Sequence, residues 1–162
     1  MQINNVSNAG AVSSSEAVDQ LNSFLRGEIS AVETYKQALE AVKTDAIRQQ
    51  LLPCHDSHQR SVELLRRRIT DLHGEPAEGS GVWGAFAKAV EGGAALLGEK
   101  IAVSTLEEGE DHGLKDYKAD LSKLDVESRR LVEMELLAAQ LKTHRTLRDL
   151  KHSLSTLFYK SH

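Results

Sequence analysis

GEISAVETYKQAL, residues 27–39, returns in outline 82 positions later as GEDHGLKDYKADL, residues 109–121. Both stretches begin with Gly-Glu, carry Tyr-Lys in the middle and end on Leu. The same offset pairs further residues without a gap: Arg48 with Arg130, Leu65 with Leu147, Arg66 with Arg148, and His58 with Gln140. A match at one fixed period predicts that the chain contains an internal duplication.

Apolar residues around the first stretch recur in alternating steps of three and four, which predicts one face of an α-helix. That face consists of Val18, Leu21, Leu25, Val32, Leu39 and Val42, and its two remaining positions hold Glu28 and Tyr35. Ser13-x-x-Glu16 has the spacing of a capping box, so we expect the helix to begin near residue 14. Lys43-Thr44-Asp45 should end this helix and cap the next one.

Three more helical faces follow, and each carries polar residues where the pattern expects a core residue. The second face is Leu51, His55, His58, Val62, Leu65, Ile69 and Leu72, before a Gly74-Glu75-Pro76 stop signal. The third is Val103, Glu107, Glu110, Leu114, Tyr117, Leu121 and Leu124, with Asp125 as the N-cap of the next helix. The fourth is Leu137, Gln140, His144, Leu147, Lys151 and Leu154.

Two short-looped hairpins joined by one long connection predict an all-α, ferritin-like antiparallel four-helix bundle. We expect a mobile N-terminal arm over residues 1–13 and a single domain over 14–158. That domain divides into a hairpin at 14–73, a crossover at 74–98 and a hairpin at 99–158. The crossover holds most of the glycines and the only Trp, and we expect a short helix around Val82 to Leu97. It is long enough for the helices it joins to be parallel.

Composition excludes several classes of protein. With 40% hydrophobic residues, 4% aromatic residues and only 2 Pro in 162, the chain suits a helical bundle better than a sandwich or a barrel. A net charge of −4 argues against nucleic acid as a partner. No apolar run is long enough to span a membrane, and a single cysteine cannot form an internal disulfide. The N-terminus lacks the features of a secretion signal, so we expect a cytoplasmic protein.

The register of two antiparallel hairpins brings the polar positions to nearly one level of the bundle. The set comprises Glu28, His58, Glu107, Glu110, Gln140 and His144, with His55 one turn along. Carboxylates and imidazoles are ligands of Fe, Mn and Zn, and burying them without a partner is costly. We therefore treat these seven residues as a candidate site for Fe, Mn or Zn, with no organic cofactor. Tyr35 and Tyr117 could be hydrogen-bond donors or redox-active neighbours of this site.

The same residues allow a second interpretation without a metal. Glu–His and Glu–Gln pairs can satisfy one another as a polar layer that fixes helix register. The protein would then be a structural or stress-associated bundle that acts by self-association or by binding a partner. No phosphate-binding loop, nucleophile elbow or paired CxxC motif points to an organic substrate.

Three features resemble a known family: Leu25-Arg-Gly-Glu28 with Tyr35, Leu106-Glu-Glu-Gly-Glu-Asp111 with Tyr117, and the Gly-rich crossover. Over roughly residues 16–155 they resemble the bacterial DUF2383 family, a group of ferritin-like proteins of unassigned function. The resemblance implies the bundle fold and allows for a homodimer.

More broadly, the chain is similar to ferritin-like di-iron proteins such as rubrerythrin and bacterioferritin. In that comparison Glu28 and Glu110 match single helix glutamates, His58 matches a histidine ligand, and Glu107 matches an extra glutamate of rubrerythrin. His55 and Leu137 stand where the bridging glutamates belong. A single metal ion, an atypical pair of ions and a metal-free layer are thus all left open.

Overall fold

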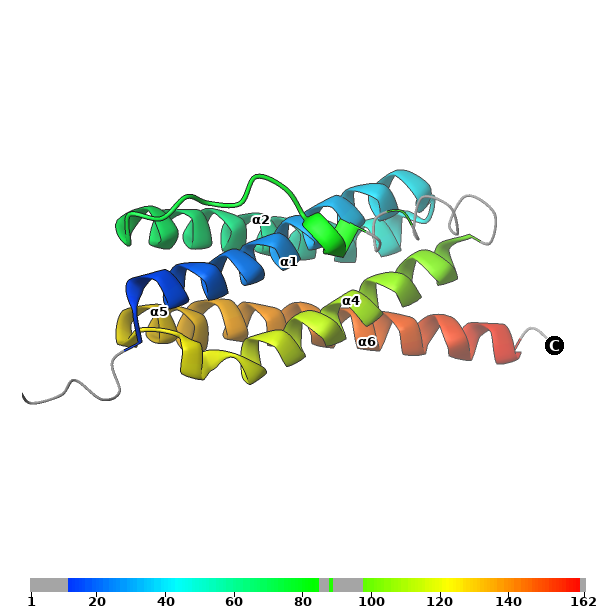
Figure 1. Ribbon diagram of the computed structural model, residues 1–162. Helices are drawn as coiled ribbons and strands as arrows, with labels where there is room; N and C mark the ends of the chain where they lie inside the picture. Colours follow the sequence, from blue (N-terminus) through cyan, green and yellow to red (C-terminus); the bar gives the residue numbers. More distant parts are fainter. Residues whose placement is uncertain (1–11, 85–87, 89–97, 161–162) are drawn as a thin grey trace, which may run out of the picture.

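The computed structural model describes residues 12–84, 88 and 98–160, and it is a four-helix bundle (Figure 1). The first two long helices are α1 (Ser14–Ala41) and α2 (Asp45–Asp71). The third is α4 (Glu99–Ala119), and the fourth run consists of α5 (Val126–Leu131), a π-helical turn η3 (Val132–Leu136) and α6 (Leu137–Lys160). Two 3-10 turns, η1 (Gly81–Gly84) and η2 (Leu121–Lys123), complete the described elements, which include no strand. The predicted all-α class is confirmed.

The helices pair as the two predicted hairpins. α1 packs along α2, α4 packs along α6, and the hairpins meet through α1 with α4 and α2 with α6. In Figure 1, α2 and α4 run in the same direction, so the connection between them returns along the bundle. Of that crossover the structure describes residues 74–84, 88 and 98, and the continuous stretch 74–84 ends in η1, which contacts α1. Most of the helix expected around Val82 to Leu97, and residues 1–11 of the expected arm, lie outside the described residues.

The ends of α1 follow the sequence signals closely. α1 begins at Ser14 because the Ser13 hydroxyl accepts a hydrogen bond from the Glu16 amide at 3.1 Å. The helix ends before Lys43 and Thr44, as expected, but Thr44 makes no side-chain cap on α2. Its hydroxyl and amide instead donate to the carboxylate of Glu99, at 2.7 and 2.6 Å. This tight turn is therefore tied to the first residue of α4.

The stop after α2 depends on His73 as well as on Gly74. His73 has a φ of 59°, the left-handed conformation usually taken by glycine at this position. The Gly74 amide then donates to the Ile69 carbonyl at 2.9 Å and closes the helix end. Gly74 is required for space, because a Cβ atom there would lie 2.6 Å from a methyl group of Val18 on α1.

The third helix ends earlier than its apolar pattern predicts. α4 stops at Ala119, so Leu121 lies in η2, where it is partly buried against the core, and Leu124 is buried. Asp125 is the N-cap of α5, as predicted, and accepts from the Ser128 amide at 3.1 Å. Its carboxylate also accepts from Arg68 of α2 at 2.9 Å, which fixes the turn against the other hairpin.

Two apolar clusters make up the core. One, around Leu51 and Val103, lies toward the α1–α2 turn, and the other, around Leu25 and Ile69, lies toward the opposite end. Each cluster draws on both hairpins, so apolar burial holds the hairpins together. Polar residues from all four long helices are buried where the two clusters meet.

Candidate functional site

His58 lies between two buried glutamates that come from different hairpins. Its Nδ1 atom is 2.6 Å from Oε2 of Glu28 on α1, and its Nε2 atom is 2.8 Å from Oε1 of Glu110 on α4. All three side chains are at most 5% exposed. The imidazole thus bridges two carboxylates with both of its nitrogens, so neither nitrogen is directed at an open position.

Neighbouring residues supply donors to the remaining carboxylate oxygens. Tyr117 donates its hydroxyl to Oε1 of Glu28, and Tyr35 donates to Oε1 of Glu110 at 2.5 Å. Gln140 and Thr143 each donate to Oε2 of Glu110 at 2.7 Å. We call these seven residues the buried polar layer: Glu28, Tyr35, His58, Glu110, Tyr117, Gln140 and Thr143. All four carboxylate oxygens in it accept at least one hydrogen bond.

The close approach of α4 to α6 lets Gln140 reach Glu110. A Cβ atom at Gly113 would lie 2.8 Å from Nε2 of Gln140, so a larger residue would displace the amide. With glycine at this position, Nε2 also donates to the backbone carbonyl of Glu110 at 3.1 Å.

In the buried polar layer, the carboxylates stabilise the charged form of His58, and the charged His58 stabilises the ionised form of Glu110. Burial lowers the pKa of His58, but the charges of Glu110 and Glu28 outweigh it and raise the pKa from 6.5 to about 10. Burial raises the pKa of Glu110, and the imidazolium of His58 with its hydrogen bonds lowers it below the ordinary value. Burial and the facing carboxylates raise the pKa of Tyr35 and Tyr117 well above 10. At neutral pH these shifts favour an imidazolium at His58, a carboxylate at Glu110 and neutral phenols at Tyr35 and Tyr117.

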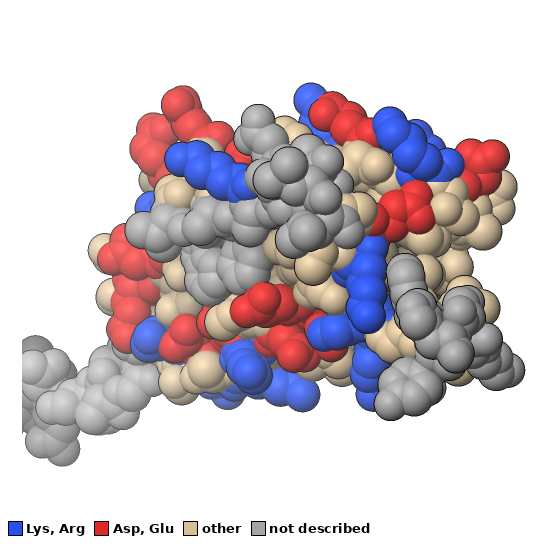
Figure 2. Space-filling view, turned by 90° about the vertical axis from the view of Figure 1, so that its right-hand side faces the viewer, with Lys and Arg blue, Asp and Glu red and all other residues tan. Residues whose placement is uncertain are grey.

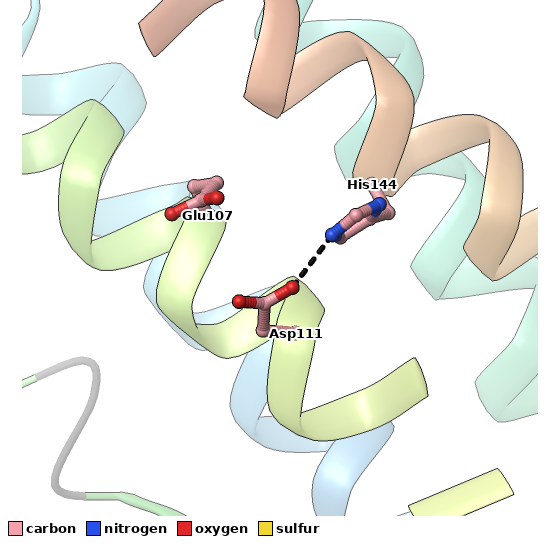
Figure 3. A group of neighbouring side chains, drawn as sticks. All are labelled: Glu107, Asp111 and His144. Atoms are coloured by element: carbon pink, nitrogen blue, oxygen red, sulfur yellow. Dashed lines mark hydrogen bonds and ion pairs between the residues drawn. The ribbon is translucent and has the colours of Figure 1, made fainter. Parts of the chain in front are cut away.

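A second group of ionisable residues lies beside α6, closer to the surface (Figure 3). Glu107 and Asp111 are one turn apart on α4, and His144 faces them from α6. One potential ligand atom from each residue lies within 4.8 Å of the other two, and all three residues are half-buried. Nε2 of His144 is 2.6 Å from Oδ1 of Asp111, and Lys151 donates to Glu107 at 2.5 Å. We call Glu107, Asp111 and His144 the α4–α6 cluster.

The seven predicted site residues divide into three sets. Glu28, His58, Glu110 and Gln140 meet in the buried polar layer. Glu107 and His144 meet in the α4–α6 cluster instead, so the structure brings the six residues together as two neighbouring groups. His55 joins neither group: its side chain is half-buried, and its ring contacts Asp56 at 3.1 Å.

This division follows from the rotation of the helices about their axes. At four positions that the pattern assigns to the core, the residue just before the assigned one is buried. These residues are Cys54 before His55, Leu106 before Glu107, Thr143 before His144, and Leu150 before Lys151. Steps of three and four fit both choices, since an α-helix has 3.6 residues per turn. The earlier residue is the more apolar in all four cases, and that signal predicts the burial correctly. The sequence interpretation missed Asp111 and Thr143, although Asp111 lies four residues after Glu107 on the same helix face.

The fold and this interior define a class: an antiparallel four-helix bundle of two helix hairpins with a buried Glu–His–Glu layer between them. Residues 16–123, two-thirds of the chain, match the family model of DUF2383, a domain of unknown function, and the chain belongs to that family. No curated protein and no solved structure matches the chain significantly. The family match covers Glu28, His58 and Glu110, whereas α6, with Gln140 and His144, lies beyond it.

Two surface properties bear on the partners of the chain. Among the described residues, no helix combines the length and apolar character needed to cross a membrane. Figure 2 shows Lys and Arg interspersed with Asp and Glu on one end of the bundle, and the described residues of that face form no continuous basic surface. A homodimer remains a prediction.

Proposed function

We propose that this DUF2383 protein binds a first-row transition metal ion, Fe, Mn or Zn, at the α4–α6 cluster. The observation that carries the proposal is the convergence of one imidazole and two carboxylates from two helices within 4.8 Å. Protein ligands lie about 2.0–2.2 Å from such an ion, so small side-chain rotations would bring all three ligand atoms within bonding distance of one ion. Imidazole with carboxylate is a donor set that these metals accept.

The metal-free contacts of the cluster suggest how binding would be regulated. Nε2 of His144 pairs with Asp111, and the Lys151 ammonium pairs with Glu107. An ion would replace both contacts, so Lys151 competes with it for Glu107. Replacing Lys151 by Gln should therefore increase the affinity for metal, whereas replacing His144 should remove a ligand.

The test is metal analysis of full-length protein purified without chelator, followed by calorimetric titration with Mn²⁺ and Zn²⁺. We expect saturable binding of one ion, tighter binding in Lys151→Gln, and at least a tenfold loss in His144→Gln, the size typical when support of a metal ligand is lost. Glu108→Gln is the control for a general effect of a charge change on α4, because Glu108 is exposed on the same helix and is not a member of the cluster. Equal affinity in all four proteins would reject the proposal.

The buried polar layer favours a second candidate, a bundle in which that layer is metal-free and fixes helix register. All four carboxylate oxygens accept hydrogen bonds, and the His58 imidazolium stands between the carboxylates in the place of a cation. Among the described residues, the buried side-chain atom without a partner is Oδ2 of Asp125, outside this layer. In His144→Gln, which lacks a ligand of the α4–α6 cluster, this candidate predicts the same melting temperature before and after treatment with EDTA, and a lower one after EDTA would contradict it.

A further inference from the structure

A pocket of about 50 Å³ opens between α1 and α4, on a different side of α4 from the cluster with α6. Small residues make room for it: Gly27 and Ala31 on α1, and Gly109 and Gly113 on α4. An ordered water needs about 10–15 Å³ by this kind of measure, so the pocket can hold a few waters or a molecule with a handful of heavy atoms.

The lining of the pocket follows the internal duplication. The offset of 82 relates Phe24 to Leu106, Gly27 to Gly109 and Thr34 to Asp116, and all six residues line the pocket. The buried carboxylates of Glu28 and Glu110, another such pair, lie at its inner end. The cavity is thus a shared feature of both hairpins and would be absent from either one alone.

The pocket combines apolar walls with negative charge. Phe24, Leu106 and the glycines supply the walls, and Glu28, Glu110 and Asp116 contribute three carboxyl groups. No Lys or Arg is among the lining residues that the structure describes, and the imidazole of His58 already bonds to both glutamates. Asp116 lies nearer the surface, where partial burial raises the pKa of its carboxyl. A cation beside it would relieve this cost, and an anion would add to it.

We propose that this pocket binds a small primary ammonium ion with a short apolar chain. The His58 imidazolium balances one of the three carboxyl groups, so the pocket still favours a further positive charge, most directly beside Asp116. The ammonium group supplies that charge, and the chain packs against Phe24 and Leu106. A carboxylate of the same size would be repelled, and an alcohol of the same size would lose the charge-assisted hydrogen bonds. The inference is independent of metal binding, because it uses no residue of the α4–α6 cluster.

The test uses the full chain labelled with ¹⁵N and three four-carbon probes of similar size: n-butylammonium, 1-butanol and butyrate. Glycine amides make convenient reporters, and Gly27, Gly109 and Gly113 line the pocket, whereas Gly74 lies at the end of α2. We expect saturable shifts of the three pocket glycines with butylammonium, about tenfold weaker binding of butanol, and no shift with butyrate. Gly74 should not respond.

Two variants locate the binding. Gly27→Leu should abolish the shifts by filling the pocket, and it should fold, since a Cβ atom at Gly27 meets no atom within 4 Å. Asp116→Asn should weaken butylammonium binding several-fold and leave butanol binding unchanged. Asp19→Asn is the matched control, an exposed acid on α1 with the same change in charge.

Equal shifts with butyrate, no shifts with any probe, or full binding in Gly27→Leu would overturn the inference. Butylammonium binding should be unchanged in His144→Gln. Failure of the metal proposal and failure of this one therefore give different results.

Discussion

The hydroxyl of Tyr35 on α1 donates to Oε1 of Glu110 on α4 over 2.5 Å. The offset of 82 relates this pair to Tyr117 and Glu28. Here the helices exchange roles, because Tyr117 on α4 donates to Glu28 on α1. Each copy of the repeated sequence thus contributes a carboxylate and receives a tyrosine from the other copy. Neither hairpin can satisfy its own glutamate in this way, so the duplicated residues link the two halves of the bundle.

The two tyrosines should differ in their effect on stability. Oε1 of Glu110 keeps Nε2 of His58 as a second donor when Tyr35 is replaced by Phe. Among the described residues, Tyr117 is the donor to Oε1 of Glu28, so Tyr117→Phe leaves a buried carboxylate oxygen without its partner. We expect Tyr117→Phe to lower the free energy of unfolding by about 1.5–3 kcal/mol and Tyr35→Phe by less. Urea unfolding of both variants measures this difference, and a larger loss in Tyr35→Phe would contradict the assignment of donors.

Stability should fall as the pH rises above neutrality. The pKa of His58 is about 10 in the folded chain and near 6.5 when the group is exposed, so the folded state holds this proton more tightly than the unfolded state does. The resulting stabilisation is fully present below pH 6.5 and is lost as the pH rises toward 10. Melting temperatures measured between pH 6 and 10 should decline, and the decline should be smaller in His58→Gln. A wild-type curve parallel to that of the variant would argue against the imidazolium.

The sequence predicts the helices better than it predicts their rotation. The repeat, the capping residues Ser13 and Asp125, and the long crossover correctly indicate two hairpins and a polar layer around Glu28. They do not decide whether His55 or Cys54 faces the core. Adjacent residues lie only about 100° apart around the helix, and a pattern of alternating steps of three and four residues can include either one. Packing settles the choice in favour of the more apolar residue, so Leu106 rather than Glu107 shares the buried face of α4 with Glu110.

The sequence places Tyr35 and Tyr117 near the site as candidate hydrogen-bond donors, and both are donors in the structure. The sequence does not predict which carboxylate each tyrosine contacts. Tyr35 lies two turns from Glu28 on the same helix, and intrahelical spacing gives it no direct contact with that carboxylate. Its partner, Glu110, is 75 residues away, and only the packing of α1 against α4 brings them together. Contacts of this kind depend on the interaxial geometry, which a heptad pattern does not specify.

Substitutions at two adjacent residues at the end of α2 should change the stability of the fold in opposite directions. His73 has a φ of 59°, which is strained for a residue with a Cβ atom, so His73→Gly should stabilise the fold by about 1 kcal/mol. Gly74→Ala should destabilise it by about 1–3 kcal/mol, since the new Cβ would lie 2.6 Å from Val18. Thermal unfolding of the two variants measures both effects, and a stabilising Gly74→Ala would show that α1 and α2 are packed less closely here.

The thiol of Cys54 should be unreactive in the folded protein. Burial, followed by the charge of Glu110, raises the pKa of Cys54 from 9.0 to about 11, and the residue is 4% exposed. At pH 8 this shift alone lowers the thiolate fraction about a hundredfold, and the thiolate is the form that attacks disulfide reagents. We expect reaction with a disulfide reagent to be slow in native buffer and fast in denaturant, where the thiol is exposed. Tyr117→Phe should accelerate the native reaction, because a less stable fold opens more often. A fast native reaction that is unaffected by stability would mean that Cys54 is accessible in the folded bundle.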